Sequence, residues 1–491
     1  MTAETIGLAV LLLGMLLLLA KLIRVRWRLS QRLFIPSSLI AGGIALLLGP
    51  EVLGAVLGLF GVDWFADGGI FTAEIVEVWS VIPELLISVV FAALFLGLRL
   101  PRLREAGRLA GPQVAFGLTL GSGQYVIGLL LALLVLTPVF GLPPMSGALI
   151  EIGFEGGHGT AAGLGGTFAD LGFEEGQDLA LGLATVGLLS GIIAGIVLVN
   201  WGVRRGHTAA LSLDSGPSVS ERQGIVEREQ RGAAAILTVR PSSVEPLALH
   251  FGLIALAVGI GQLFLSSLQL LEQLLWADQF ELFEFVPLFP LAMLGGVVVQ
   301  FAIERLDRAE VVDRMMMERI QGFALDALII AALGSLSLTA IAENAGPFLI
   351  LAVAGVVWSL SAFVFLARRV MPDYWFERGL ADTGQSLGVT ATGLILLRVA
   401  DPELRTPAYQ AFGYKQLLIE PFFGGGLFTA ASLPLIVAFG PVPFLIAMSV
   451  LLLLSLMSGL LYFGRMGSPQ LAQGDQSTTD IRPPHRGEDL T

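Results

Sequence analysis

A short stretch of the chain, "EIGFEGGHGTAAGLGG" (Glu151–Gly166), combines two carboxylates, one histidine and seven glycines. Glu151 and Glu155 are spaced i, i+4 and therefore share one face of a helical turn. Each glycine inside a helix costs about 1 kcal/mol relative to alanine, so a continuous helix is disfavoured here. We expect a tight turn whose free backbone groups can touch a ligand, with a half-helix N-terminus that attracts anions.

A second stretch, "GLADTGQSLGVTATGLILLR" (Gly379–Arg398), offers a carboxylate, an amide and several hydroxyl groups, interrupted by glycines. Its polar residues are Asp382, Thr383, Gln385, Ser386, Thr390 and Thr392. Hydroxyl, amide and carbonyl oxygens are hard ligands that suit a cation such as Na+. Threonine hydroxyls and exposed N–H groups suit a carboxylate. The threonines can instead bond back to their own helices.

Three kinds of chemistry are open to these stretches. The chain has four histidines and none lies beside His158, so a histidine metal site is excluded. His158 can be a hydrogen-bonded structural residue, a substrate contact or a proton carrier. An intramembrane enzyme would use His158 with Glu155 or Glu151 as an acid–base pair. No HExxH or GxSxG motif supports an enzyme, and a passive channel would not need two such broken stretches.

The composition places these residues in a membrane protein. Apolar residues make up 55% of the 491, charged residues only 14%, and the mean hydropathy is +0.81. Long apolar runs recur from end to end, which predicts an all-α polytopic membrane protein. The net charge of -12 argues against a nucleic-acid partner. The chain has no cysteine, which excludes disulfides and thiol chemistry, and no cofactor is expected.

Apolar windows of about 20 residues give the expected spans. We predict helices near 5–23, 35–60, 81–100, 111–137 and 178–203, then near 247–271, 285–304, 321–341, 346–368 and 413–439, and an extra one near 442–464. The stretches at about 145–169 and 378–400 are too broken for ordinary spans. If each enters and returns on one side as a re-entrant hairpin, all basic loops fall inside. The N-terminus then lies outside and the C-terminus in the cytoplasm.

Short internal similarities predict two related halves. "VVFAALFLG" (Val89–Gly97) resembles "LIIAALGSL" (Leu328–Leu336), and "GTAAGL" (Gly159–Leu164) resembles "VTATGL" (Val389–Leu394). Five crossings in each half invert the second half relative to the first, the arrangement found in many secondary transporters. The expected domains are an N-terminal repeat 1–204, a cytoplasmic linker 205–246, a C-terminal repeat 247–440, an extra helix 441–466 and a polar tail 467–491.

Several motifs together resemble the sodium/glutamate symporter family. They are "GGHGTA" (Gly156–Ala161), "ATVGLLSG" (Ala184–Gly191), "GQSLGVTATGL" (Gly384–Leu394) and "IPSSLIAGG" (Ile35–Gly43). The likeness spans about residues 5–440. It implies a dimeric symporter with two inverted five-helix halves, a re-entrant hairpin in each, and Na+-driven uptake of L-glutamate. It also implies that a transport domain moves against a scaffold.

The resemblance and the residue chemistry give the predicted site. The predicted substrate-binding residues are Gly157, His158, Gly159, Thr160, Gln385, Ser386, Thr390 and Thr392. The predicted Na+ ligands are Glu155, Thr160, Asp382 and Thr390. No catalytic residue is expected. The chain departs from better-known members at Glu155, where they have a small hydroxyl residue, and at Ala391, where they often have proline. An acid at 155 either repels glutamate or adds a cation ligand.

The predicted function is therefore a Na+-coupled symporter that imports L-glutamate across the plasma (inner) membrane by alternating access. The alternative is a Na+- or proton-coupled carrier for another small carboxylate or amino acid. The expected partners are the small anion, Na+, the lipid bilayer and a second copy of the chain.

Overall fold

The computed structural model describes residues 2–32, 35–60, 69–98, 103–209, 223–275, 283, 286–307, 310–401 and 405–465. Over these residues the chain is helical, without a strand, which confirms the all-α prediction. Nine helices within the described ranges are long and apolar enough to cross a membrane. The predicted tail 467–491 and the linker residues 210–222 lie outside the described residues.

The first half runs from α1 to α11. Its helices are α1 (Ala3–Arg26), α2 (Arg28–Arg32), α3 (Ser37–Leu48), α4 (Ala55–Leu59), α5 (Ala73–Ala93), α6 (Leu103–Leu131), α7 (Thr137–Phe140), α8 (Leu149–Phe154), α9 (Gly157–Gly163), α10 (Gly165–Asp170) and α11 (Glu175–Arg205). The predicted broken stretch at about 145–169 corresponds to the three short helices α8, α9 and α10. Broken backbone is therefore confirmed where glycine is most frequent.

The second half contains α13 to α22. Its helices are α13 (Pro246–Leu275), α14 (Leu288–Leu306), α15 (Arg314–Gly334), α16 (Leu338–Glu343), α17 (Ala345–Ala362), α18 (Arg368–Val370), α19 (Trp375–Ala400), α20 (Ala408–Ile419), α21 (Leu427–Phe439) and α22 (Pro441–Met457). The extra helix expected near 442–464 is present as α22 and the short turns that follow it, a candidate span Pro441–Arg465.

Three predicted helices differ from the structure. The helix expected near 81–100 is α5, which begins and ends seven or eight residues earlier, because its acidic first two turns are helical although polar. The helix expected near 321–341 is α15, shifted in the same direction and started by an Asp313 cap. The prediction of a single helix near 413–439 is wrong. This segment is divided into α20 and α21 at Glu420–Gly426, where Gly424 and Gly425 adopt positive φ.

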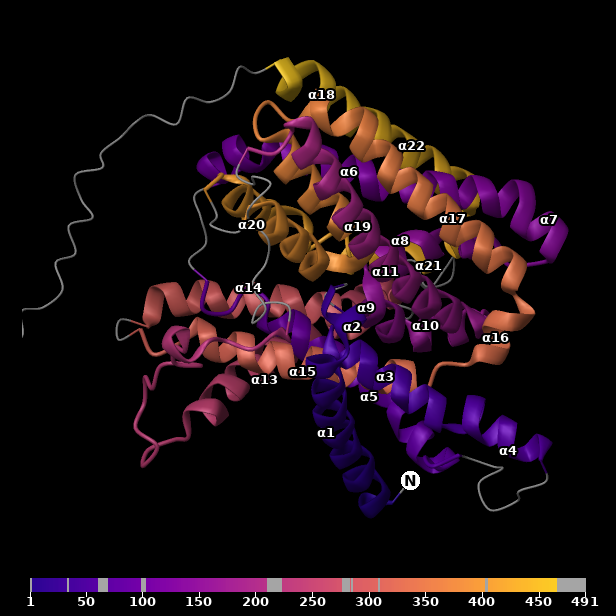
Figure 1. Cartoon of the computed structure of the whole chain (residues 1–491), viewed down its shortest axis with the longest axis vertical. Coiled ribbons are helices and arrows are strands. Elements are labelled where there is room, and N and C mark those ends of the chain that lie inside the picture. Colours follow the sequence, from indigo (N-terminus) through magenta and orange to yellow (C-terminus); the bar gives the residue numbers. More distant parts are fainter. Residues whose placement is uncertain are drawn as a thin grey trace, which may run out of the picture.

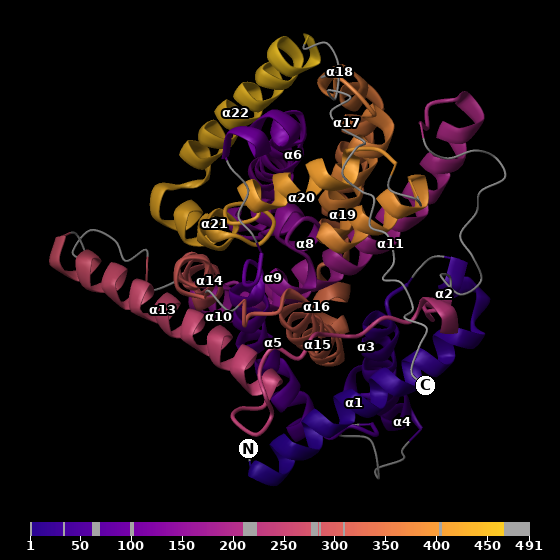
Figure 2. The same cartoon turned by 90° about the vertical axis from the view of Figure 1, so that its left-hand side faces the viewer.

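The helices form two groups, seen one above the other in both Figure 1 and Figure 2. The hairpin body comprises α6, α8, α9, α11, α17 and α19–α22. The flanking body comprises α1, α3, α5 and α13–α15. Packing within each group is extensive, as between α11 and α19 or between α5 and α15. Between the groups, the main packing is that of α9 on α5 and α15. One buried apolar cluster nevertheless continues across both.

Packing in the flanking body is reciprocal between the two halves of the sequence. α1 packs on α3 as α13 packs on α14, while α3 packs on α15 as α14 packs on α5. The similar segments Val89–Gly97 and Leu328–Leu336 lie at the ends of α5 and α15, which pack against each other.

Glycines on α11 allow α19 to pack closely against it. A side chain at Gly187 would collide with the carbonyl oxygen of Leu387, and one at Gly191 would approach Leu387 and Thr392. Gly195 lies against Leu396 in the same way. Small residues spaced four apart let helix backbones approach closely in membranes. The motif "ATVGLLSG" is therefore a packing surface for the second broken stretch.

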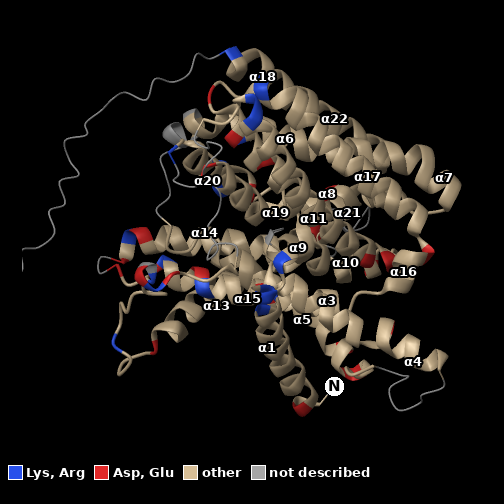
Figure 3. Ribbon diagram, in the orientation of Figure 1, with Lys and Arg blue, Asp and Glu red and all other residues tan. Residues whose placement is uncertain are grey.

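Charged residues gather differently at the two ends of the helices. Basic residues lie at the ends of α14, α15 and α18, namely Arg305, Arg314, Arg368 and Arg369. Around α4, α10 and α16, the charged residues in view are acidic (Figure 3). This separation is the pattern expected of a membrane protein with basic loops on one side.

Candidate transport site

The first broken stretch forms a tip that lies deep against α11. Phe154, at the end of α8, lies against Gly187 of α11, ten residues beyond Gln177. After the tip the chain returns, because Gln177 Nε2 donates to Ala162 O (3.4 Å) and lies against Gly165. Ten residues of helix span about 15 Å. The chain thus turns at Glu155–Gly157 and then runs back along α11.

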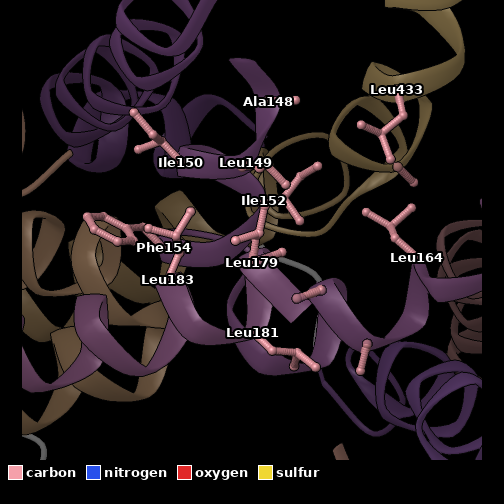
Figure 4. Packing of buried hydrophobic residues seen from close by; sticks show 14 of the residues in the cluster. Ala148, Leu149, Ile150, Ile152, Phe154, Leu164, Leu179, Leu181, Leu183 and Leu433 are labelled. Carbon is pink, nitrogen blue, oxygen red and sulfur yellow. The ribbon is translucent and has the colours of Figure 1, made fainter. Parts of the chain in front are cut away.

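Apolar packing fixes the arm that leads to this tip. Leu149, Ile150, Ile152 and Phe154 of α8 are fully buried, and they pack toward Leu179 and Leu183 of α11 and Leu433 of α21 (Figure 4). This anchorage positions the glycines that follow.

The second broken stretch turns back at Gly388–Val389 inside α19. Gly388 and Val389 have non-helical dihedrals, and Val389 has a φ of 60°, which is rare for a β-branched residue. A Cβ on Gly393 would lie 2.5 Å from Ala381 O. Residues twelve apart in a straight helix are about 18 Å apart, so the two arms of α19 run back along each other.

The two tips meet each other and a third glycine-rich segment. A Cβ on Gly157, which has a φ of 70°, would collide with Cγ1 of Val389. A side chain at Gly425, in the Glu420–Gly426 break between α20 and α21, would collide with Thr160 Oγ1. Three interruptions of helix thus converge at one place.

A cavity of about 530 Å³ opens beside the tips, between the two bodies. The hairpin body contributes Glu155–Thr160, Gly388–Thr392 and Glu420, and the flanking body contributes residues of α5 and α15 such as Phe91 and Asp326. The cavity extends along α15 to Arg314 and Glu318. Of the predicted site residues, Glu155, Gly157, His158, Gly159, Thr160, Thr390 and Thr392 line it. Asp382, Gln385 and Ser386 do not belong to its lining.

Two side chains at the first tip have unused oxygen atoms. Glu155 Oε2 and Thr160 Oγ1 are buried and have no hydrogen-bond partner among the residues that the structure describes. The residues themselves are 2% and 1% exposed. His158 differs, because its Nε2 lies 2.9 Å from Thr185 Oγ1 on α11. The Thr185 hydroxyl donates to Leu181 O (3.2 Å), so it accepts from N–H at Nε2.

Both carboxylate oxygens of Glu151 accept hydrogen bonds, in contrast to Oε2 of Glu155. Its carboxylate accepts from Tyr125 Oη (2.6 Å), Thr429 Oγ1 (2.7 Å) and the Gly424 backbone N–H (3.1 Å). It therefore ties the first hairpin to α6 and to the glycine break beside α21.

Three polar side chains of the second hairpin have protein partners, whereas Thr383 Oγ1 is buried without one among the described residues. Thr390 Oγ1 donates to Glu420 Oε1 (3.3 Å) and accepts from Gln416 Nε2. Thr392 Oγ1 donates to Gly388 O. Ser386 Oγ lies 2.9 Å from both Gln124 Nε2 and Ser359 Oγ, facing α6 and α17.

Asp382 and Gln385 share a buried lysine on α20. Lys415 Nζ lies 3.5 Å from Asp382 Oδ1 and donates to Gln385 Oε1. Gln113 Nε2 also reaches Asp382 Oδ1 at 3.4 Å. The exposed fraction of the Lys415 side chain is 1%.

Five side chains that hold residues of the two hairpins in place were not predicted from the sequence: Gln113, Gln124, Tyr125, Lys415 and Thr429. Lys415 gave a usable signal, because an ionisable residue within an apolar stretch is a functional candidate in itself. The polar residues of α6 are a weaker sign of function, since single glutamines and tyrosines are common in membrane-spanning helices.

The spans and the broken helices that meet beside a cavity between two helix groups define a multi-pass membrane transporter of the secondary type. The chain belongs to the sodium/glutamate symporter family, whose profile matches residues 2–398. The family's function is Na+-coupled glutamate import, and it is the function of this chain. No individual curated protein matches it. The match stops short of the expected limit near residue 440, so α20–α22 lie beyond it.

Proposed function

We propose that glutamate and Na+ bind where the two tips meet, and that the hairpin body moves against the flanking body to expose this site alternately to the two sides. The observation that carries this proposal is the contact of Gly157 with Val389 at the wall of the cavity. Broken helices that meet within the membrane offer backbone groups that lipid cannot satisfy and a ligand can.

The contact between the two bodies suits movement. Gly159 and Gly163 present a surface without side chains to Ile87 of α5. The connecting helix α16 is bonded to both bodies at its start. Ser337 N donates to Asp178 of α11 (3.0 Å), and Leu338 N donates to Glu51 on the flanking side (3.0 Å). A small contact and a connection whose first residues bond to both bodies describe a hinge between two rigid groups.

Glu155 and Thr160 are the Na+ ligands that the geometry favours most. Both carry buried oxygen atoms without a donor. A buried carboxylate without a partner is costly, and a bound cation would offset that cost. Glu155 therefore serves as a cation ligand rather than as a group that repels glutamate. Thr390 is a further candidate, since it lines the same cavity.

Glutamate would lie beside these ions and against Gly157, His158, Gly159 and the second tip. The Na+ charges offset the repulsion between Glu155 and the substrate carboxylates. Thr390 and Thr392 would supply hydroxyl groups, and Gln385 and Ser386 would support the second hairpin from behind.

The two halves are proposed to be inverted repeats, each with a re-entrant hairpin. The reciprocal packing of α3 on α15 and α14 on α5 supports this. With basic residues inside, the N-terminus lies outside, the C-terminus lies in the cytoplasm, and the cavity that reaches Arg314 opens inward. The chain would function in the plasma (inner) membrane as a homodimer, the assembly that the family resemblance implies.

Uptake into proteoliposomes tests the transport proposal. Labelled glutamate should accumulate when Na+ outside exceeds Na+ inside, and an inside-negative potential should increase the uptake. A proton gradient alone should not drive it. Accumulation that requires a proton gradient, or equal flux in choline, would exclude Na+ coupling.

Cysteine accessibility tests the re-entrant arrangement, because the natural chain has no cysteine and single substitutions need no other change. Leu325→Cys in the cavity should react with an impermeant maleimide from the cytoplasmic side. Excess Na+ and glutamate that favour the outward state should slow that reaction. Gly141→Cys and Gly172→Cys, at exposed positions at the two ends of the first hairpin, should both react only from outside. Reaction of these two from opposite sides would mean that the hairpin crosses the membrane.

A further inference from the structure

We propose that the ammonium group of Lys415 is a built-in cation that occupies the position predicted for a Na+ ion at Asp382, so that this protein needs one external cation fewer per transport cycle. The inference rests on the proposed Na+-coupled transport and deepens it. It concerns α20, which lies outside the residues matched by the family.

The surroundings of Lys415 are those of a monovalent cation site. Asp382 Oδ1 lies 3.5 Å from Nζ, and the neutral oxygen Oε1 of Gln385 accepts a hydrogen bond from it. Within the described part of the chain, Asp382 Oδ2 and Gln113 Oε1 are buried without partners, so hard oxygens remain unused around the same carboxylate. A carboxylate with neutral oxygens around it is what Na+ would bind if the ammonium were absent.

The space around the ammonium matches a compact charge. A Cβ on Gly117 of α6 would lie 2.8 Å from Lys415 Nζ, so the ammonium occupies the space that this glycine leaves free. One turn further along α6, Gly121 leaves space for Glu155 Oε2 in the same way. The two glycines are four residues apart and share a face, so Lys415 and Glu155 lie about one helical turn apart.

The charge balance of the hairpins favours a role for this ammonium in coupling. Glu151, Glu155, Asp382 and Glu420 are buried or nearly buried acids around the junction of the tips. Lys415 acts electrostatically on Glu155, Asp382 and Glu420. It is one of only two lysines among the 28 basic residues of the chain. Arginine carries a larger, planar charge, so a lysine is the side chain that best imitates a small cation.

Binding of radioactive Na+ to the purified full-length chain tests this inference. With saturating glutamate, Lys415→Gln should bind one Na+ more per chain than the natural protein, because Asp382 recruits an ion. The double variant Lys415→Gln/Asp382→Asn should return to the natural number, since the carboxylate is also gone. Lys21→Gln is the matched control, because Lys21 donates to backbone oxygens of the linker, Gln223 O and Gly224 O (3.2 and 2.7 Å).

Each outcome decides the inference. An unchanged Na+ count in Lys415→Gln means that Asp382 takes a proton or another partner, and the inference is wrong. If the extra ion persists in the double variant, it binds elsewhere, and the inference is wrong for that reason instead. The single variant should also gain more thermal stability from NaCl, relative to choline chloride, than the natural protein gains. If it aggregates equally in both salts, Na+ does not replace the ammonium and the inference is overturned.

These measurements stay separate from the test of transport. Failure of the natural protein to show Na+-driven uptake removes the proposed function. An unchanged Na+ count in Lys415→Gln alongside normal uptake by the natural protein removes only the built-in cation.

Discussion

The two hairpins meet tip to tip, yet the carboxylate and hydroxyl groups that they bring to the cavity differ in their hydrogen-bond partners. At the first tip, Glu155 Oε2 and Thr160 Oγ1 are buried and find no partner in the described ranges. In the second hairpin, Gln385, Ser386 and Thr390 all bond to side chains of α6, α17 or α20. The backbone breaks also differ, since the first tip turns at a glycine with positive φ and the second at Val389.

This difference indicates that the two hairpins have different roles in binding. The first tip retains unsatisfied oxygens at a cavity, which is the state of a site that awaits a cation. The second hairpin is held by neighbours that fix its shape and supply internal charge. Binding energy for Na+ is thus expected to reside mostly at the first tip, and variants of the two hairpins should fail in different ways.

The largest effect is expected where the tips touch. Gly157→Ala places a Cβ against Val389 at a φ of 70°. The left-handed backbone costs about 1–2 kcal/mol for a non-glycine residue, and the overpacking adds about 1–3 kcal/mol. We expect uptake to be abolished and the melting temperature of the purified protein to fall.

Two variants separate the causes. Gly172→Ala has a similar φ of 74° with no atom within 4 Å of the added Cβ, so it should show the backbone cost alone. In Gly157→Ala/Val389→Ala the colliding methyl group is removed, and the remaining atom, Val389 Cβ, lies 3.6 Å away. This double variant should recover to the stability of Gly172→Ala. Equal stability of Gly157→Ala and Gly172→Ala would show that the tips do not touch.

Sequence patterns predicted the broken stretches better than the partners that hold them. The glycines of Glu151–Gly166 and the polar residues of Gly379–Arg398 marked both breaks, because local helix propensity is written in adjacent residues. The break at Gly424–Gly426 was not predicted, because one apolar window over residues 413–439 averages out Glu420, Pro421 and the three glycines. Contacts such as Lys415 with Asp382 or Tyr125 with Glu151 join distant parts of the chain, and no local pattern carries them.

The two carboxylates of the first hairpin should respond differently to neutralisation. Glu155→Gln removes a charge with a free oxygen, so the apparent Na+ affinity of uptake should fall. An interaction with a charged group is worth about 1.5–3 kcal/mol, which corresponds to about a 10- to 150-fold change. The melting temperature in the absence of Na+ should not fall, because the variant loses a buried carboxylate oxygen that has no partner among the described residues. Sodium titrations of initial uptake rates give the affinity.

Glu151→Gln provides the contrast, since Glu151 accepts from three donors. An amide cannot accept at both positions, so stability should fall by about 1–3 kcal/mol, while Na+ affinity in the surviving protein stays near the natural value. If the two variants exchanged these behaviours, the free oxygen of Glu155 would not be the cation ligand.

The hydroxyl groups of the two tips should give a smaller contrast. Thr160→Val removes a free oxygen, and a neutral ligand worth about 0.5–1.5 kcal/mol changes Na+ affinity about 2- to 13-fold. Thr390→Val breaks the chain from Gln416 to Glu420, so it should lower the maximal uptake rate without unfolding the protein. Rates measured against Na+ and glutamate separate the two effects. Full activity of Thr390→Val would remove Thr390 from the site.

The smallest effect is expected at His158. Its Nε2 donates to a hydroxyl, Thr185 Oγ1, rather than to a carboxylate that could receive and return a proton. Glutamine can make a similar bond, so His158→Gln should retain uptake within about threefold, as expected for one neutral hydrogen bond of about 0.5–1.5 kcal/mol that is partly replaced. The dependence of uptake on external pH should keep its shape. A flattened pH profile, or uptake that no longer responds to a proton gradient when the natural protein does, would instead identify His158 as a proton carrier and favour proton coupling.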